Sequence, residues 1–190
     1  MTRIALSGYA RSGKDAMAAI LVEKHGYLRV SFADPMREAL LALNPLVPAI
    51  RRIPLLGYSY TACLRLSDLV GLYGWDRAKV DYPEIRELLQ RFGTEVGRNL
   101  FGEDFWVGMA MRKAAEHPRV VFSDCRFGDE ARAVLGAGGA VVRVVRPGVG
   151  PVNAHVSDRA LPDELITHTL LNDGTLEDLA AKVGELVERL

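Results

Sequence analysis

The chain has 190 residues, of which 49% are hydrophobic, so it is long enough for one domain with a full core and short for two independent ones. Lysine and arginine together number 24, as do aspartate and glutamate, and this zero net charge argues against nonspecific binding to nucleic acids. The longest apolar runs, such as residues 39–43 and 140–145, are far shorter than the roughly 20 residues that a membrane span needs.

The start of the sequence and its two cysteines predict a cytoplasmic protein. A strand-like segment begins close to Met1, which leaves no room for the charged and apolar regions of a signal peptide. Cys63 and Cys125 lie far apart and match no metal-ligand spacing. We therefore expect two reduced thiols and no zinc site.

The first part of the chain alternates strands with helices. An apolar run at residues 3–7 predicts a strand that stops at Gly8, and a helical pattern follows at residues 14–24. Residues 28–32 alternate as a second short strand, and a helix is expected at residues 34–43 with a proline in its first turn.

The middle of the chain is less regular. Between Asn44 and Tyr82, prolines, scattered glycines and weak periodicity predict short helices and loops. Residues 83–92 carry one apolar face at helical spacing, and Gly93 is a candidate end or kink of that helix. A further helix is expected at residues 105–116.

The last third returns to alternation. Apolar runs predict strands at residues 119–124, 140–145 and 165–171, with a helix at residues 130–135 between the first two. A start signal at Thr175-x-x-Asp178 predicts a terminal helix. This order of elements predicts an α/β fold, a parallel sheet with helices on both faces.

A phosphate-binding loop is predicted between the first strand and the first helix. The segment GYARSGK fits the pattern G-x-x-x-x-G-K in the strand–loop–helix setting that a P-loop requires. Its glycines let backbone N–H groups converge on phosphate oxygens, and its lysine supplies an ammonium for the transferred phosphoryl group. The alternative is a glycine-rich turn with an exposed lysine. The residues predicted to bind a nucleoside triphosphate are Gly8, Arg11, Ser12, Gly13 and Lys14.

Two carboxylates are candidate magnesium ligands. Asp15 replaces the Ser or Thr that usually ligates magnesium in such loops, and Ala16 follows it. A carboxylate here is suited to hold Mg²⁺ directly or through water, but it would repel phosphate without the metal. The alternative is an acidic residue in a helical first turn. Asp124 ends an apolar strand, where P-loop enzymes keep a second metal-linked carboxylate, or else it caps the next helix.

Several charged residues are placed at predicted strand ends. Asp34 follows the second strand and is suited to orient the surroundings of an acceptor phosphate, a metal-bound water or a sugar hydroxyl, or else to cap a helix. Arg37, one turn later, either neutralises the acceptor phosphate or is a solvated helix residue. Arg126 and Arg146 are candidate clamps of the γ-phosphoryl group.

Residues 90–98 place polar and cationic groups beside two glycines inside an amphipathic helix. Arg91 and Arg98 are guanidinium forks suited to a monophosphate, and Gln90 and Thr94 are available for the edges of a base. Trp106 is suited to stack on the acceptor base. The alternatives are a surface helix for this segment and a core position for the tryptophan.

The segments GYARSGKD, SFADPMREAL, LLQRFGTEVGRNLFGEDFW, FSDCRFGDEA, RVVRPG and NDGTLEDL together resemble the phage-type deoxynucleoside monophosphate kinases. The resemblance spans nearly the whole chain and is weakest at residues 44–75. It implies a three-layer P-loop NTPase fold over residues 1–190, with a helical acceptor-binding insertion at about 36–106. Residues 147–162, which include His155 and Arg159, are predicted to form a lid that excludes water.

The resemblance also implies roles for single residues. Asp15 becomes a family trait, whereas Ala16 departs from the Thr that such loops often carry. The turn that holds Asn172 and Gly174 is implied to contact the adenine of the donor, although as a plain turn before a helix it needs no ligand.

We therefore expect a kinase that transfers the γ-phosphoryl group of ATP to a deoxynucleoside monophosphate and requires Mg²⁺. Its predicted catalytic residues are Lys14, Asp34, Arg126 and Arg146. The alternatives are a kinase of dephospho-CoA or another small metabolite, and a nucleotide-binding regulatory module without turnover. The expected partners are the two nucleotides, with neither nucleic acid nor membrane, and a homodimer is left open. The expected location is the cytoplasm, that of the host if a phage encodes the chain.

Overall fold

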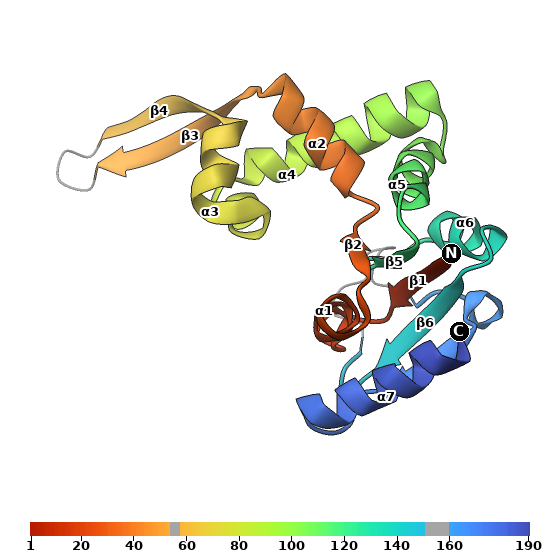
Figure 1. Cartoon of the computed structure of the whole chain (residues 1–190). Coiled ribbons are helices and arrows are strands. Elements are labelled where there is room, and N and C mark those ends of the chain that lie inside the picture. Colours follow the sequence, from red (N-terminus) through yellow and green to blue (C-terminus); the bar gives the residue numbers. More distant parts are fainter. Residues whose placement is uncertain (54–57, 151–159) are drawn as a thin grey trace. The chain divides into compact units, whose positions relative to one another are not determined.

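A parallel sheet is built from the short apolar segments of the chain (Figure 1). The computed structural model describes residues 1–53, 58–150 and 160–190, with the backbone alone at 49–53 and 58–62. The strands of the sheet are β1 (Thr2–Ser7), β2 (Leu28–Val30), β5 (Arg119–Phe122), β6 (Ala140–Val145) and β7 (His168–Leu171). Their order is β2-β5-β1-β6-β7, and all neighbours are parallel, as predicted.

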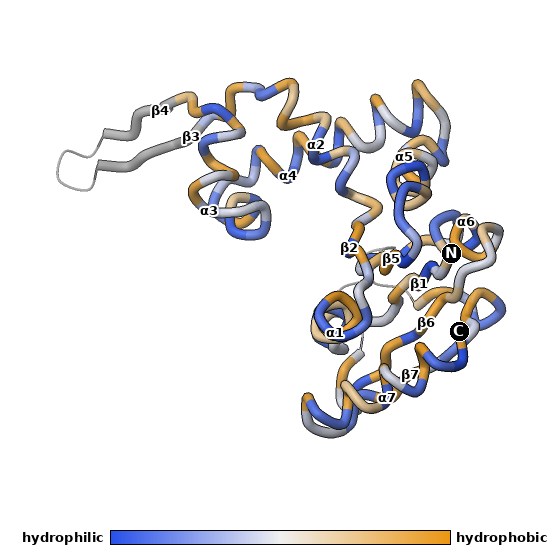
Figure 2. Tube along the Cα trace, viewed as in Figure 1, coloured by the Kyte–Doolittle hydropathy of each residue, from blue (hydrophilic) through white to orange (hydrophobic). Residues whose placement is uncertain are grey.

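Helices cover both faces of this sheet, because successive side chains of a strand point to opposite faces. Ile4 of β1 packs in one buried cluster with α1 (Lys14–His25) and α7 (Leu176–Arg189). Ala5, the next residue, packs in a second cluster with α5 (Phe105–Ala115) and α6 (Gly128–Gly136). Figure 2 shows β6 as a hydrophobic stretch beside the mixed colours of α7. The predicted three-layer α/β fold is confirmed.

Three strands are shorter than predicted, and one of them, β5, ends at Phe122 and not at Asp124. β2 ends at Val30, because the backbone N–H of Phe32 donates to the carboxylate of Asp124 and leaves the strand ladder. β7 begins at His168, because Asp163–Leu165 forms a 3₁₀ turn, η3, before it. A contact with the distant side chain of Asp124 therefore ends β2, whereas a local backbone turn delays the start of β7.

The start signal predicted for the terminal helix is confirmed. The hydroxyl of Thr175 accepts from the backbone N–H of Asp178 at 3.2 Å, and the Asp178 carboxylate accepts from the N–H of Thr175 at 2.8 Å. These two bonds satisfy donors that the first turn of a helix would otherwise leave without partners.

Residues 33–106 form a second compact unit, separate from the one made by residues 1–32 and 107–190. It contains α2 (Asp34–Leu43), an antiparallel hairpin of β3 (Leu46–Ile53) and β4 (Tyr58–Arg65), α3 (Leu66–Asp81), α4 (Pro83–Arg91) and the π-helix η1 (Phe92–Phe101). Its own core includes the buried residues Leu40, Leu66, Leu69 and Ile85. Gly74 breaks α3 with a φ of 69°.

The prediction of short helices and loops for residues 44–82 is wrong for β3 and β4, which form a hairpin. It is confirmed for α3, in which a kink at Gly74 separates two shorter helices. Pro48 lies opposite Cys63 in that hairpin. A two-stranded ribbon consists only of edges, and edges tolerate proline, so its presence did not exclude a strand. The insertion expected at 36–106 is therefore not purely helical.

The other predictions on domain organisation stay predictions. The second unit has nearly the extent of the predicted acceptor-binding insertion. Most of the predicted lid, including His155 and Arg159, lies outside the described residues. Within residues 1–53, 58–150 and 160–190, no helix has the length and hydropathy of a membrane span.

Candidate active site

The phosphate loop joins β1 to α1 and is shaped by two glycines. Gly8 and Gly13 have φ angles of 132° and 106°, which residues with a side chain rarely adopt. A Cβ on Gly8 would lie 2.4 Å from the carbonyl oxygen of Val144, and one on Gly13 would lie 2.2 Å from Nδ2 of Asn172. Both positions therefore require glycine for space as well as for conformation. Arg11, in the same loop, has a left-handed φ of 67°.

Lys14 lies across this loop. Its Nζ donates to the carbonyl oxygens of Gly8 and Tyr9, each at 2.7 Å. Burial and the nearby guanidinium of Arg126 lower the pKa of Lys14, against a smaller opposing effect of Asp15. The structure thus brings Lys14 and Arg126 close enough for their positive charges to interact.

Ser12 carries a buried hydroxyl in the middle of the loop. The residue is 1% exposed, and its Oγ has no hydrogen-bond partner among the described residues. A buried hydroxyl without a partner costs on the order of 1–3 kcal/mol, so native proteins rarely leave one unless a ligand or water satisfies it. This atom fits a loop that binds an anion.

The turn at residues 172–174 fastens the loop to the rest of the sheet. Asn172 donates from Nδ2 to the carbonyl oxygen of Ser12 at 2.9 Å. Its backbone N–H donates to the carbonyl oxygen of Val145 at 2.7 Å. Asp173 pairs with Lys182 at 2.6 Å. Gly174 leaves room for Asp178, since a Cβ would lie 2.4 Å from Oδ2 of that residue. The predicted contact with adenine stays a prediction.

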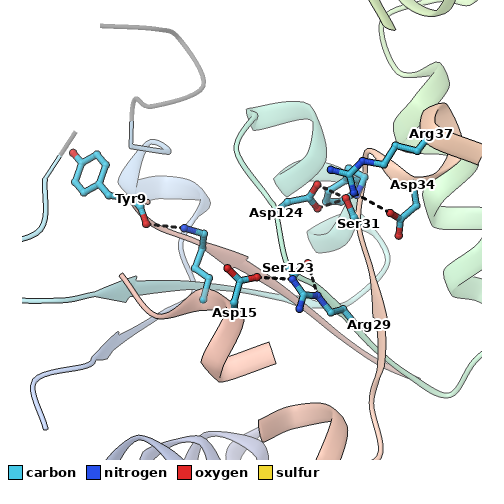
Figure 3. Close-up of polar contacts among 10 residues, drawn as sticks. Tyr9, Asp15, Arg29, Ser31, Asp34, Arg37, Ser123 and Asp124 are labelled. Carbon is cyan, nitrogen blue, oxygen red and sulfur yellow. Dashed lines mark hydrogen bonds and ion pairs between the residues drawn. The ribbon is translucent and has the colours of Figure 1, made fainter. Parts of the chain in front are cut away.

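Asp15 is engaged with Arg29, a residue that sequence reasoning missed. Nη2 of Arg29 lies 2.5 Å from Oδ1 of Asp15, and Nε of Arg29 donates to Oγ of Ser123 at 3.1 Å (Figure 3). Asp15 and Arg29 are 14 residues apart, on α1 and β2, so no local spacing indicated the pair.

Asp124 is engaged as well. Its carboxylate accepts from the hydroxyl of Ser31 and, at 2.9 Å, from the backbone N–H of Phe32 (Figure 3). It thereby ties the end of β2 to β5 and does not cap α6. Among the described residues, no group of three or more His, Cys, Asp or Glu side chains is suited to hold a metal ion. Asp15 and Asp124 are thus both engaged with protein donors in this structure, and their role as magnesium ligands stays a prediction.

Glu130, which sequence reasoning also missed, holds the start of α6. Its Oε2 accepts from the backbone N–H groups of Arg126 and Phe127 at 2.7 and 3.0 Å. Burial, with the nearby charges of Asp124 and Asp129, raises the pKa of Glu130 to about 7. A glutamate three residues into a helix is the signal that could have found it.

The two candidate clamps lie on the surface of the first unit. Arg126 is exposed, and its backbone N–H is one of the two donors that Glu130 holds. Arg146 is exposed and follows β6, two residues after the Val144 carbonyl that crowds Gly8. Both therefore lie at the carboxyl edge of the parallel sheet, where ligands bind in folds of this class.

Asp34 and Arg37 interact with each other in the second unit. Arg37 Nη1 lies 3.5 Å from Asp34 Oδ1, and the Arg37 guanidinium lies 5.9 Å from the centroid of the Trp75 ring. Asp34 is the first residue of α2, and the N-cap position belongs to Ala33. Asp34 is thus not the N-cap that the alternative interpretation expected.

The segment with two glycines is a π-helix. η1 follows directly on α4, and π-helices are rare and frequent at functional sites. Trp106 Nε1 donates to the carbonyl oxygen of Gly93 at 2.9 Å, and a Cβ on Gly97 would lie 1.9 Å from the same nitrogen. The packing of Trp106 therefore explains Gly97, whereas a Cβ on Gly93 would lie 2.7 Å from the sulfur of Met36. The centroids of the Trp106 and Phe92 rings lie 5.6 Å apart.

The remaining acceptor candidates lie on α4 and η1. Arg91 is exposed and pairs with Glu95 at 3.1 Å. Gln90 and Thr94 are exposed, and Arg98 is half-buried. All predicted acceptor residues lie in the second unit and all predicted ATP-binding residues in the first, so the two sets follow the division of the chain.

Comparisons with known proteins agree with a nucleotide kinase. Residues 76–183 match the family model described as deoxynucleotide monophosphate kinase. The deoxynucleotide monophosphate kinase of Enterobacteria phage T4 is 24% identical over 241 residues, covering 100% of both chains. A protein of Acanthamoeba polyphaga mimivirus, provisionally given the same name, is 28% identical over 210 residues, covering 99% of this chain and 97% of the relative.

A solved structure was also found. The dephospho-CoA kinase from Campylobacter jejuni aligns over 100% of this chain and 97% of that chain, with 10% identity and a TM-score of 0.47.

Proposed function

The chain belongs to the deoxynucleotide monophosphate kinase family, and from this we propose which of its residues bind each substrate. Its activity is that of a deoxynucleotide monophosphate kinase, a phosphotransferase with ATP as the donor. The proposal concerns the division of this task among the residues described above, with a nucleoside diphosphate as the product.

We assign the donor triphosphate to the phosphate loop. The observation that carries this assignment is the buried Ser12 hydroxyl without a partner, inside a loop that Gly8 and Gly13 hold open to close approach. Backbone N–H groups at the start of α1 add partial positive charge toward bound phosphates. Arg11 belongs to the same loop, and Asn172 supports it through Ser12.

Lys14, Arg126 and Arg146 are proposed to stabilise the transferred phosphoryl group. Phosphoryl transfer through a loose transition state gathers negative charge on the equatorial oxygens, so positioned cations supply most of the catalysis. The acceptor phosphate is already anionic at neutral pH, so no general base is needed. The lowered pKa of Lys14 has burial as its main cause, and a partly desolvated ammonium acts more strongly on a nearby charge.

The acceptor monophosphate is assigned to Arg91 and Arg98, with Gln90 and Thr94 near its base. The pair of Arg91 with Glu95 is exposed, and such pairs contribute only about 0–1 kcal/mol, so a phosphate can replace the glutamate. Asp34 and Arg37 are proposed to orient the acceptor. For Trp106, the contacts with both glycines favour a role in holding η1 over stacking on a base.

Magnesium, assembly and location remain proposals of a coarser kind. We expect Mg²⁺ to be required, but we assign no step to it, because both candidate carboxylates are engaged with protein donors. A homodimer stays open. The cytoplasm is the proposed location, since ATP and nucleoside monophosphates are found there.

The test is a coupled assay of ADP release with ATP and each common deoxynucleoside and ribonucleoside monophosphate, with dephospho-CoA included. We expect turnover with one or more deoxynucleoside monophosphates and none with dephospho-CoA. Turnover with dephospho-CoA alone would favour the small-metabolite kinase. Tight ATP binding without ADP release for every acceptor would favour the regulatory module.

A further inference from the structure

Asp15 presents an electrostatic problem. It follows Lys14 directly, in the first turn of the helix that begins at the phosphate loop. A triphosphate carries several negative charges, and a carboxylate beside it weakens binding unless a cation offsets the carboxylate. A cation of the protein close to Asp15 would therefore help the phosphate loop to bind a triphosphate.

Arg29 is that cation. Its guanidinium contacts Asp15 through Nη2 and Ser123 through Nε, so the side chain is held at two points. Figure 3 shows the carboxylate of Asp15 pointing toward Arg29. Ser123 is 6% exposed and precedes Asp124 at the end of β5. The buried hydroxyl thus fixes the direction from which Arg29 reaches the start of α1.

We propose that Arg29 is a positioning residue for donor binding, which neutralises Asp15 and thereby weakens the repulsion between this carboxylate and a triphosphate in the phosphate loop. This inference rests on the proposed assignment of the donor to the phosphate loop. Arg29 acts through Asp15 and not by contacting the phosphates.

The exposure of the pair separates this role from a structural one. The side chains of Arg29 and Asp15 are 47% and 85% exposed. An ion pair as exposed as this adds little to the stability of a fold. Loss of Arg29 should therefore weaken the binding of a polyanion while leaving the melting temperature nearly unchanged.

The experiment measures ATP binding by calorimetry in EDTA, at low ionic strength, for the full chain. Arg29→Gln should raise the Kd for ATP about fivefold, a change of the size that exposed charge pairs reach. Asp15→Asn should leave the Kd unchanged or lower it. The double variant Arg29→Gln/Asp15→Asn should bind like the wild type, because no unpaired carboxylate remains.

Two further variants serve as controls. Arg119→Gln also removes one positive charge, but at the first residue of β5, far along the strand from Ser123. The Arg119 side chain donates to the carbonyl oxygen of His25, and its loss should leave the Kd for ATP unchanged. Should Arg29→Gln fail to fold, Ser123→Ala keeps both charges but removes the anchor of Arg29. It should weaken ATP binding about twofold, an effect expected to vanish when Asp15→Asn is added.

An unchanged Kd in folded Arg29→Gln would overturn the inference. So would a double variant as weak as Arg29→Gln, since Arg29 would then act on the phosphates themselves. The proposed donor site fails separately, if the wild type does not bind ATP or if Lys14→Ala binds it equally well.

Discussion

The phosphate loop and the π-helix η1 both depend on pairs of glycines, but for different reasons. Gly8 and Gly13 are required by the φ angles of the loop and by neighbouring atoms of Val144 and Asn172. Gly97 has an ordinary helical φ and is required only because Trp106 lies against it. The glycines of the phosphate loop recur at a fixed spacing because the backbone conformation of the loop requires them. A glycine that is required by one tertiary contact produces no general sequence pattern.

The strongest test of the loop is the removal of its lysine. Lys14→Ala should lower kcat on the order of 10²-fold or more, because a positioned charge at the transition state is worth a few kcal/mol. Steady-state kinetics with saturating substrates measure it. Lys24→Ala, in the last turn of the same helix, is the matched control and should turn over normally. Near-normal turnover of Lys14→Ala would remove the P-loop assignment.

Gly97→Ala tests the other half of the comparison. The new Cβ would meet the Trp106 ring, so overpacking should destabilise the protein by about 1–3 kcal/mol. If η1 carries the acceptor site, the KM for the monophosphate should rise while that for ATP stays unchanged. Gly108→Ala in α5, where a Cβ meets nothing within 4 Å, should instead be neutral or stabilising by up to ~1 kcal/mol. Equal behaviour of the two variants in thermal melts would contradict the packing argument.

The same difference between local patterns and tertiary contacts separates the features that the sequence predicted from those that it did not. The strand at 140–145 and the cap at Thr175 follow from local patterns, and both are confirmed. The hairpin of β3 and β4 was not predicted, because its proline suggested a loop. Both strands of a two-stranded ribbon are edge strands, and edge strands tolerate proline. Among site residues, the phosphate loop was predicted from the spacing of its glycines and lysine. Arg29 was not, because its two partners lie in α1 and directly after β5, and only the fold brings them together.

Glu130 allows a test of the first unit through pH. Its pKa of about 7 in the folded protein lies above the ordinary value of 4.5, so protonation favours the folded state. The stabilisation is complete below pH 4.5 and is lost as the pH rises to 7. Glu130→Gln keeps an oxygen acceptor for the helix start and should flatten this decline, which we expect to be about 3 kcal/mol. Melting temperatures across that range measure it. An equally steep decline in the variant would refute the assignment to Glu130.

Substitution of Arg91 and Arg98 tests whether these two residues bind the acceptor monophosphate. A lysine cannot reproduce the two parallel bonds of a guanidinium fork, so Arg91→Lys and Arg98→Lys should each raise the KM for the monophosphate several-fold, roughly 1 kcal/mol. The KM for ATP should not change. Arg86→Lys, on the exposed side of α4, is the control. A rise in the KM for ATP instead would mean that the two binding sites have been exchanged.

The smallest expected effect is at Asp15, where a local pattern and a tertiary contact disagree. Its position after Lys14 suggested a magnesium ligand, but its carboxylate is paired with Arg29. If the pair persists with ATP bound, Asp15→Asn should leave the midpoint of a Mg²⁺ activation curve within about twofold of the wild type and change stability by a few tenths of a kcal/mol.

The contrary result is equally informative. A metal ligand that loses its full negative charge binds Mg²⁺ more weakly, so a midpoint shifted well beyond twofold would show that Asp15 leaves Arg29 to hold the ion. Activity titrated with Mg²⁺ at fixed free ATP, in Asp15→Asn and in the wild type, distinguishes the two outcomes. An unshifted midpoint would mean that Asp15 stays paired with Arg29. Its position in the motif suggested a magnesium ligand, but the fold would then give it a different role.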